Sequence, residues 1–167
     1  MLLAFYAADG RASSPDFRAP QRHWLLEAIK TIWVTFQTRF CELWTASATR
    51  EGSSAGCIMD RHVYGTAAVS GNGESAAEAV RDRVITQIFA DSLGFAGCKM
   101  IRRVVGIAHV ADLESIEENS IRAVCEQRVL KMGRTLVVDR NALTSIDHVI
   151  ALAEATRNDG KQPFYPL

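Results

Sequence analysis

The sequence predicts an all-α fold, and three observations support this prediction. Apolar residues recur at steps of three and four along most of the chain, which is the period of one helix face. No stretch alternates convincingly between apolar and polar residues, apart from a short ambiguous run at 136–138. The 167 residues are 48% hydrophobic and 23% charged, so the chain has enough apolar material for one folded core.

The longest predicted helix runs from about Arg22 to Ala48. Pro20 lies just before it, at a position where proline commonly precedes a helix. Its apolar stripe consists of Leu25, Ile29, Ile32, Trp33, Phe36, Phe40, Leu43 and Trp44. We interpret the tryptophans of this region as core packing rather than as a binding cage; they are Trp24, Trp33 and Trp44.

A small, polar and aperiodic segment follows, from Glu51 to Glu74. Its runs 52–56 and 70–73 consist of glycine, serine, alanine and asparagine, which is typical of a flexible connection. A connection of this length is uncommon inside a compact domain and indicates a mobile insertion or a lid. We favour the plain insertion.

Two apolar stretches come next. Ser75 with Glu78 three residues later matches a capping box, which predicts a helix start. The stripe of this helix is Val80, Val84, Ile85, Ile88, Phe89 and Leu93. Gly94 and Gly97 predict a break, after which a third apolar run covers 98–110.

The last part of the chain predicts two more helices after an acidic connector at 112–119. The first has the stripe Ile121, Val124, Cys125, Val129, Met132 and Leu136. Thr144 with Asp147 resembles a cap for the second, which continues through Ala153. We therefore expect one helical domain over 1–158, with a flexible loop at 51–74 and a disordered tail at 159–167.

Composition excludes several classes of function. Nineteen basic residues balance nineteen acidic ones, so nothing indicates a nucleic-acid partner. No signal peptide is apparent, and we expect no segment that approaches the ~20 apolar residues of a membrane span. The cysteines have no C-x-x-C pair and are expected to be reduced, which fits the cytoplasm; they are Cys41, Cys57, Cys98 and Cys125.

The segment 91–110 carries the candidate binding residues. Burying a cation costs several kcal/mol unless a partner compensates it, so cations within so apolar a run need a reason. On a helix, Lys99, Arg102 and Arg103 share one side, and Gly106 and His109 extend it. Arginine suits phosphates and paired sugar hydroxyls, which favours an anion-binding and hydroxyl-binding face. The alternatives are a solvated basic face, or pairing with the acids at 112–118.

Several kinds of catalytic machinery are missing from the sequence. It has no glycine-rich phosphate loop, no kinase-type catalytic loop and no carboxylate pair that would hold magnesium. It has no G-x-S-x-G elbow, and its histidines show neither triad nor ligand spacing. We assign no catalytic residue and no metal ligand.

The chain resembles the 5-methylthioribose kinases. The strongest likeness is the segment 94–117, which reads GFAGCKMIRRVVGIAHVADLESIE. The helix at 24–40 and the opening LLAFYAADG at 2–10 are similar too, and 121–136 matches more loosely. The resemblance covers most of the chain except 52–73 and the residues after about 158.

This resemblance implies the C-terminal helical lobe of a fold similar to protein kinases and aminoglycoside phosphotransferases. The family uses ATP and magnesium to phosphorylate the 1-hydroxyl of methylthioribose in methionine salvage. Its nucleotide lobe, catalytic aspartate and magnesium motif precede the stretch that 1–10 resembles, so we expect no residues for ATP or magnesium here and no activity of the isolated chain. Arg102 and Arg103 are implied as substrate-binding residues, with Lys99 and His109 lining the cleft.

Two other functions remain open. The chain could be a non-catalytic helical interaction module descended from the kinase, since a helical lobe without its complement exposes apolar surface. It could also be a simple anion-binding protein that uses Lys99, Arg102 and Arg103 without sugar chemistry. The expected partner is the sugar methylthioribose, a homodimer is left open, and neither nucleic acid nor membrane is expected.

Overall fold

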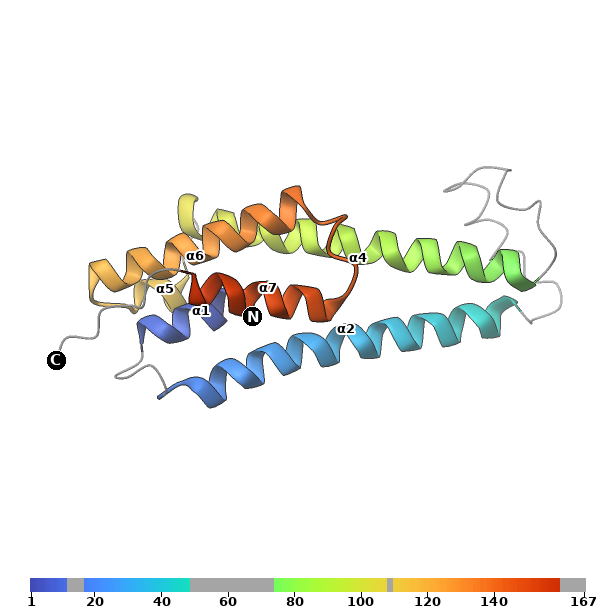
Figure 1. Cartoon of the computed structure of the whole chain (residues 1–167), viewed down its shortest axis with the longest axis horizontal. Helices are drawn as coiled ribbons and strands as arrows, with labels where there is room; N and C mark the ends of the chain where they lie inside the picture. Colours follow the sequence, from blue (N-terminus) through green and yellow to red (C-terminus); the bar gives the residue numbers. More distant parts are fainter. Residues whose placement is uncertain (12–16, 49–73, 108–109, 160–167) are drawn as a thin grey trace. The chain divides into compact units, whose positions relative to one another are not determined.

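The computed structural model describes residues 1–11, 17–48, 74–107 and 110–159 (Figure 1). Every regular element in these ranges is a helix, which confirms the predicted all-α class. The helices are α1 (Leu2–Gly10), α2 (Ala19–Ala48), α4 (Glu74–Val105), α5 (Ala111–Glu114), α6 (Asn119–Val138) and α7 (Ile146–Asn158). The contacts divide the chain into two compact units, Met1–Thr31 with Ala90–Leu167 (unit 1) and Ile32–Phe89 (unit 2), so α2 and α4 each contribute to both.

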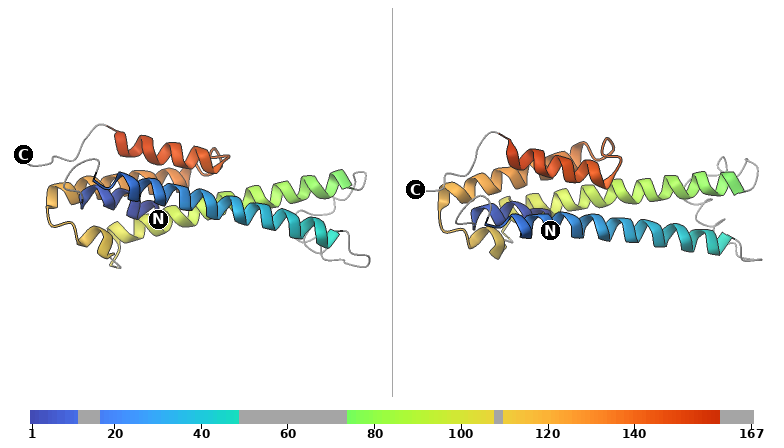
Figure 2. Two further views of the ribbon diagram at one scale, coloured as in Figure 1. Left: turned by 90° about the horizontal axis from the view of Figure 1, so that it is seen from below. Right: turned by 60° about the horizontal axis from the view of Figure 1, so that its bottom comes forward.

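Helix α1 lies in the core of unit 1. Its residues 5–9 are all buried, and it contacts α5 and α6 (Figure 2). The Tyr6 hydroxyl donates a hydrogen bond to the Ala153 carbonyl at 3.2 Å, which ties α1 to α7. An apolar cluster of Ala7, Leu113, Ile116 and Cys125 joins α1 to α5 and α6. The buried face of α1 therefore organises the helices of unit 1 around it.

Two glycines set the crossing of α4 and α6. A Cβ added to Gly97 would lie 2.5 Å from the Gly133 carbonyl oxygen, and one added to Gly133 would lie 3.1 Å from the Gly97 carbonyl oxygen. The two backbones therefore touch, because neither residue has a side chain. The predicted break at Gly94 and Gly97 was wrong: α4 is continuous through both, since Gly97 serves helix packing rather than termination.

The starts of two helices differ from the prediction. Helix α4 includes Ser75, which is therefore not its N-cap. The cap of α7 is Ser145 rather than Thr144, and the Ser145 hydroxyl accepts a hydrogen bond from the His148 amide at 3.2 Å. The ambiguous run at 136–138 is the last turn of α6.

Unit 2 contains the second half of α2 and the first half of α4. The rings of Trp33 and Phe89 pack with their centroids 4.6 Å apart, and this contact joins the two helices. Phe36, Phe40 and Trp44 form a series of tilted ring contacts along α2. Trp33 and Trp44 are half-buried, but Trp24, in unit 1, is 62% exposed, so core packing was wrong for Trp24.

The segment Glu78–Val105 of α4 is long and apolar enough to cross a membrane when judged by length and composition alone. The expectation that no segment reaches this length was therefore wrong. The core helix of a folded domain meets the same criterion, and α4 packs its Gly97 directly on α6.

The predicted loop at 51–74 and tail at 159–167 fall almost wholly outside the described residues. The exceptions are Glu74, the first residue of α4, and Asp159, which forms an ion pair with Lys131.

Candidate functional site

The predicted binding residues lie in the last turns of α4, within unit 1. Lys99 and Arg102 are exposed, while Arg103 is half-buried and is held by an interaction within the chain. The opposite side of the helix carries buried residues, including Leu93 and Met100. The crossing with α6 therefore fixes which side of α4 faces outward, and it brings the two exposed cations onto that side.

Helical geometry places Arg102 at the middle of the exposed side. With about 100° between successive residues, Phe95, Cys98, Arg102 and Val105 fall within an arc of about 80°. All four are exposed. Arg103 is rotated by about 100° from Arg102, which explains why one arginine is exposed and the other half-buried.

The predicted pairing with the acids at 112–118 does not engage the exposed cations. No carboxylate of the described residues forms an ion pair with Lys99 or Arg102. Asp112 instead pairs with Arg11 at 3.2 Å. Arg102 and Arg103 do lie in the last turn of α4, where positive charge interacts favourably with the helix dipole.

Gly106 ends the helix rather than opening space for a ligand. Its amide donates to the Arg102 carbonyl at 3.0 Å, and a Cβ at this position would lie only 2.5 Å from the same oxygen. The group that approaches Gly106 is therefore the carbonyl of Arg102. His109, predicted to line the cleft, lies outside the described residues.

A buried ion cluster around Asp9 was missed by the sequence analysis. The Asp9 side chain is 1% exposed and lies within ion-pair distance of three guanidinium groups. These are Arg22 at 3.0 Å, Arg128 at 3.1 Å and Arg157 at 2.9 Å, from α2, α6 and α7. One carboxylate of α1 thus joins four helices of unit 1.

Nothing local in the sequence predicts this cluster. Asp9 reads as the polar end of an apolar run, and its partners Arg128 and Arg157 follow it by 119 and 148 positions. One signal was available. Asp9 directly follows the apolar residues 5–8, so if these residues are buried its charge is buried with them and needs a partner. Because the guanidinium groups surround Asp9 in the core, we assign the cluster a structural role.

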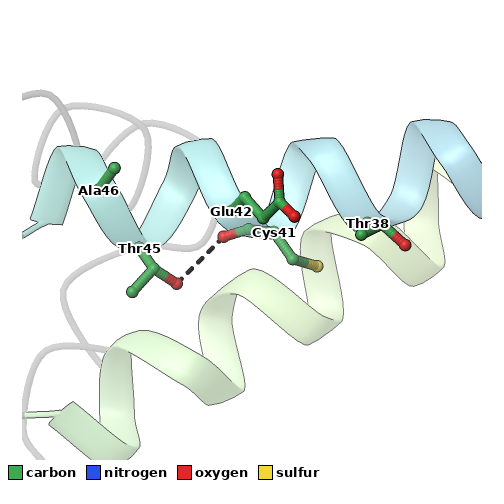
Figure 3. Close-up of a pocket in the computed structure, with 5 residues that line it drawn as sticks. All are labelled: Thr38, Cys41, Glu42, Thr45 and Ala46. Atoms are coloured by element: carbon green, nitrogen blue, oxygen red, sulfur yellow. Dashed lines mark hydrogen bonds between the residues drawn. The ribbon is translucent and has the colours of Figure 1, made fainter.

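Unit 2 has a shallow hollow of about 580 Å³ beside the outer part of α2 (Figure 3). It is lined by Thr38, Cys41, Glu42, Thr45 and Ala46, all from one helix. The Thr45 hydroxyl already donates to the Cys41 carbonyl at 3.0 Å. A binding site needs polar groups that converge from several directions, and the described residues around this hollow do not provide them.

The described residues do not fit a metal ion. Among them, no group of three or more histidine, cysteine, aspartate or glutamate side chains could hold one. Magnesium is usually held by carboxylates together with substrate phosphates.

Comparison with known proteins identifies relatives of the chain. No family model matches it. It is 35% identical to methylthioribose kinase 2 of rice (Oryza sativa subsp. japonica) over 95% of the chain and 35% of the relative. It is 32% identical to a methylthioribose kinase of Escherichia coli over 92% of the chain and 34% of the relative. The chain is similar to about a third of these methylthioribose kinases. A third relative, from Pectobacterium atrosepticum, is 35% identical over 90% of the chain and 32% of the relative.

The chain spans about a third of the length of the curated relatives that it matches. The resemblance stated from residues 94–117 is confirmed, and so is the all-helical character of this part. The structure places two of the four predicted site residues, Lys99 and Arg102, on the exposed side of α4, with Arg103 at its edge.

Proposed function

We propose that this chain is the C-terminal, substrate-side part of an S-methyl-5-thioribose kinase. The whole enzyme would phosphorylate the 1-hydroxyl of methylthioribose with ATP and magnesium, a step of methionine salvage. The observation that carries this proposal is the match to methylthioribose kinases over at least 90% of the chain in each of the three relatives described above. The isolated chain would be inactive, because it matches only about a third of those enzymes.

In this function Arg102 and Arg103 would contact the sugar or the phosphoryl group that is transferred. The arginine fork can donate two parallel hydrogen bonds to paired oxygens, and a fixed positive charge stabilises negative charge that develops during transfer. Arg102 is exposed and has no carboxylate partner among the described residues, so its donors are available to a ligand. Lys99, one turn earlier, adds a second exposed cation.

A hybrid enzyme tests the assignment. The chain would replace the matching third of rice methylthioribose kinase 2, and phosphorylation of methylthioribose would be followed with ATP and magnesium. We expect activity in the hybrid and a fall of about 100-fold or more in kcat/KM for Arg102→Ala and for Arg103→Ala. Arg134→Ala, at an exposed arginine of α6, is the matched control and should leave kcat/KM within about twofold.

Two results would reject the proposal. A folded hybrid that binds nucleotide but turns over normally with both arginine variants would remove the site assignment. A hybrid that phosphorylates other sugars but not methylthioribose would contradict the assignment of methylthioribose as the substrate.

The anion-binding alternative is tested on the isolated chain by calorimetry. Titration with inorganic phosphate and with methylthioribose would distinguish it, because a simple anion site prefers phosphate and ignores the sugar.

A further inference from the structure

The exposed side of α4 in unit 1 carries apolar side chains that a folded protein normally covers. Phe95 is 73% exposed, Val105 71% and Ile107 99%. Single exposed apolar residues are ordinary, but several on one side of a helix indicate a candidate interaction site. We define the α4 outward face by its exposed residues Phe95, Cys98, Lys99, Arg102 and Val105, together with Ile107 just beyond the helix.

These residues form one continuous strip along the exposed side of α4. From Phe95 to Val105 the strip is about 15 Å long, at 1.5 Å per helical residue. Apolar side chains occupy both ends, and the two cations Lys99 and Arg102 lie between them. A surface with apolar ends and a charged middle is suited to a partner that closes over the ends and leaves the centre for an anionic or hydroxyl-bearing group.

The chain cannot bury this face by itself through rotation of α4. The opposite side of the helix is fixed by the contact of Gly97 with Gly133, where the backbones already touch. Turning Phe95 inward would move Gly97 away from α6 and place a side chain where only glycine fits. A cover for this face must therefore come from outside the described helices of unit 1.

The length of the relatives indicates what this cover is. Nearly the whole chain matches them, yet it matches only about a third of each one, so two thirds of such a kinase have no counterpart here. We propose that the α4 outward face is the docking surface for the region that corresponds to those other two thirds. This inference rests on the proposed function, because it takes the chain to be the substrate-side part of that kinase.

Charge makes two other occupants less suitable. A second copy that docked face to face would bring Lys99 and Arg102 against the same cations, because a two-fold interface pairs each surface with itself. A membrane-bound helix usually carries its cations along the border of its apolar face, but here Arg102 lies at the centre. The remaining two thirds of the kinase, folded and with acidic groups or a bound substrate opposite Arg102, would avoid both the repulsion between like charges and the unfavourable placement of a cation in a membrane.

The test measures association of the full chain with the unmatched two thirds of rice methylthioribose kinase 2, produced as a separate polypeptide. Size-exclusion chromatography with light scattering would give stoichiometry, and fluorescence titration would give Kd. We expect a one-to-one complex, weakened at least 10-fold by Phe95→Lys and by Ile107→Lys. Leu43→Lys is the matched control: Leu43 is 67% exposed, lies on α2 in unit 2, and should leave Kd within about twofold. All three sites are exposed, so circular dichroism should show unchanged folding.

Three results would overturn the proposal. A folded complement that does not bind, or that binds Phe95→Lys and Ile107→Lys as tightly as the wild type, would exclude this surface. Self-association of the chain that Phe95→Lys abolishes would assign the face to a second copy. Binding to phosphatidylserine vesicles without binding to the complement would assign it to a membrane. Because association is measured without turnover, failure here is distinguishable from failure of the sugar assignment, which the hybrid enzyme tests.

Discussion

Gly97 and Gly133 bring the backbones of α4 and α6 into direct contact, so that a methyl group on Gly97 would lie 2.5 Å from the Gly133 carbonyl oxygen. Such a distance is far inside van der Waals contact, and the obstacle is backbone, which cannot swing away as a side chain can. The crossing decides which side of α4 is buried and therefore where Arg102 points. Substitution at this contact tests the packing that holds the candidate site.

We expect Gly97→Ala to lower the free energy of unfolding by about 1–3 kcal/mol, because overpacking forces the helices apart. Gly94→Ala is the matched control in the same helix. Its new methyl group would meet only the flexible side chain of Arg140, at 3.3 Å. Alanine is also the better helix former, so this control should be neutral or stabilising by up to about 1 kcal/mol. Urea unfolding followed by circular dichroism measures both, and equal effects would contradict the packing argument.

Asp9→Asn should destabilise unit 1 strongly. The substitution removes the carboxylate that forms ion pairs with Arg22, Arg128 and Arg157, and so takes away the negative charge at the centre of this buried cluster. Breaking a buried ion pair in this way typically costs about 3–5 kcal/mol. The measurement is the free energy of unfolding in urea, with helicity as the readout.

Asp112→Asn is the control for that prediction. Asp112 also pairs with an arginine, Arg11, but this pair is partly exposed, with side-chain exposures of 44% and 26%. Solvent screens such pairs, so its loss should cost less than about 1 kcal/mol. A cost for Asp9→Asn as small as that for Asp112→Asn would show that the buried cluster is not what holds the four helices together.

The Cys125 thiol predicts how stability depends on alkaline pH. Burial raises the pKa of Cys125 from its ordinary 9.0 to about 11. Between these two pH values the unfolded chain has lost the proton while the folded chain keeps it, so the free energy of unfolding falls as pH rises. The expected slope is at most about 1.4 kcal/mol per pH unit. Burial also raises the pKa of Tyr6, which adds a loss of the same sign at higher pH.

Cys125→Ala isolates the contribution of the thiol. Urea unfolding between about pH 8 and pH 10.5 should show a shallower decline in this variant than in the wild type. Thiol labelling supplies an independent check, because exposed Cys98 should react quickly at pH 8 while Cys125 reacts only on unfolding. Rapid labelling of Cys125 in the folded chain would contradict its burial.

Periodicity predicted the helices well wherever one face of a helix is buried. The stripe that begins at Ile121 predicted a helix that the structure places at Asn119–Val138, and the stripe from Leu25 predicted one that it places at Ala19–Ala48. Prediction failed at Gly97, because the sequence cannot show whether a glycine ends a helix or admits a neighbouring backbone. It also failed to predict that Ile32 and Leu43 are exposed, because an apolar stripe does not say how much of it finds a partner.

The candidate site was predictable in part, because helical periodicity also places its residues. The position of Arg102 on an exposed helix face follows from helical spacing once the buried side is known. The role of Asp9 was not predictable, because its partners lie in distant parts of the chain and ion pairs between distant segments leave no periodic signal. Residues that act through contacts between distant segments can be identified only from a three-dimensional structure.

The ion cluster around Asp9 also determines when unit 1 can form during biosynthesis. Asp9 emerges from the ribosome 148 residues before Arg157, which at 5–20 residues per second is a delay of about 7 to 30 s. Until α7 has been made, the buried residues at 5–8 lack the helix to which the Tyr6 hydroxyl forms its hydrogen bond. Unit 1 can therefore reach its complete set of helix contacts only late in translation.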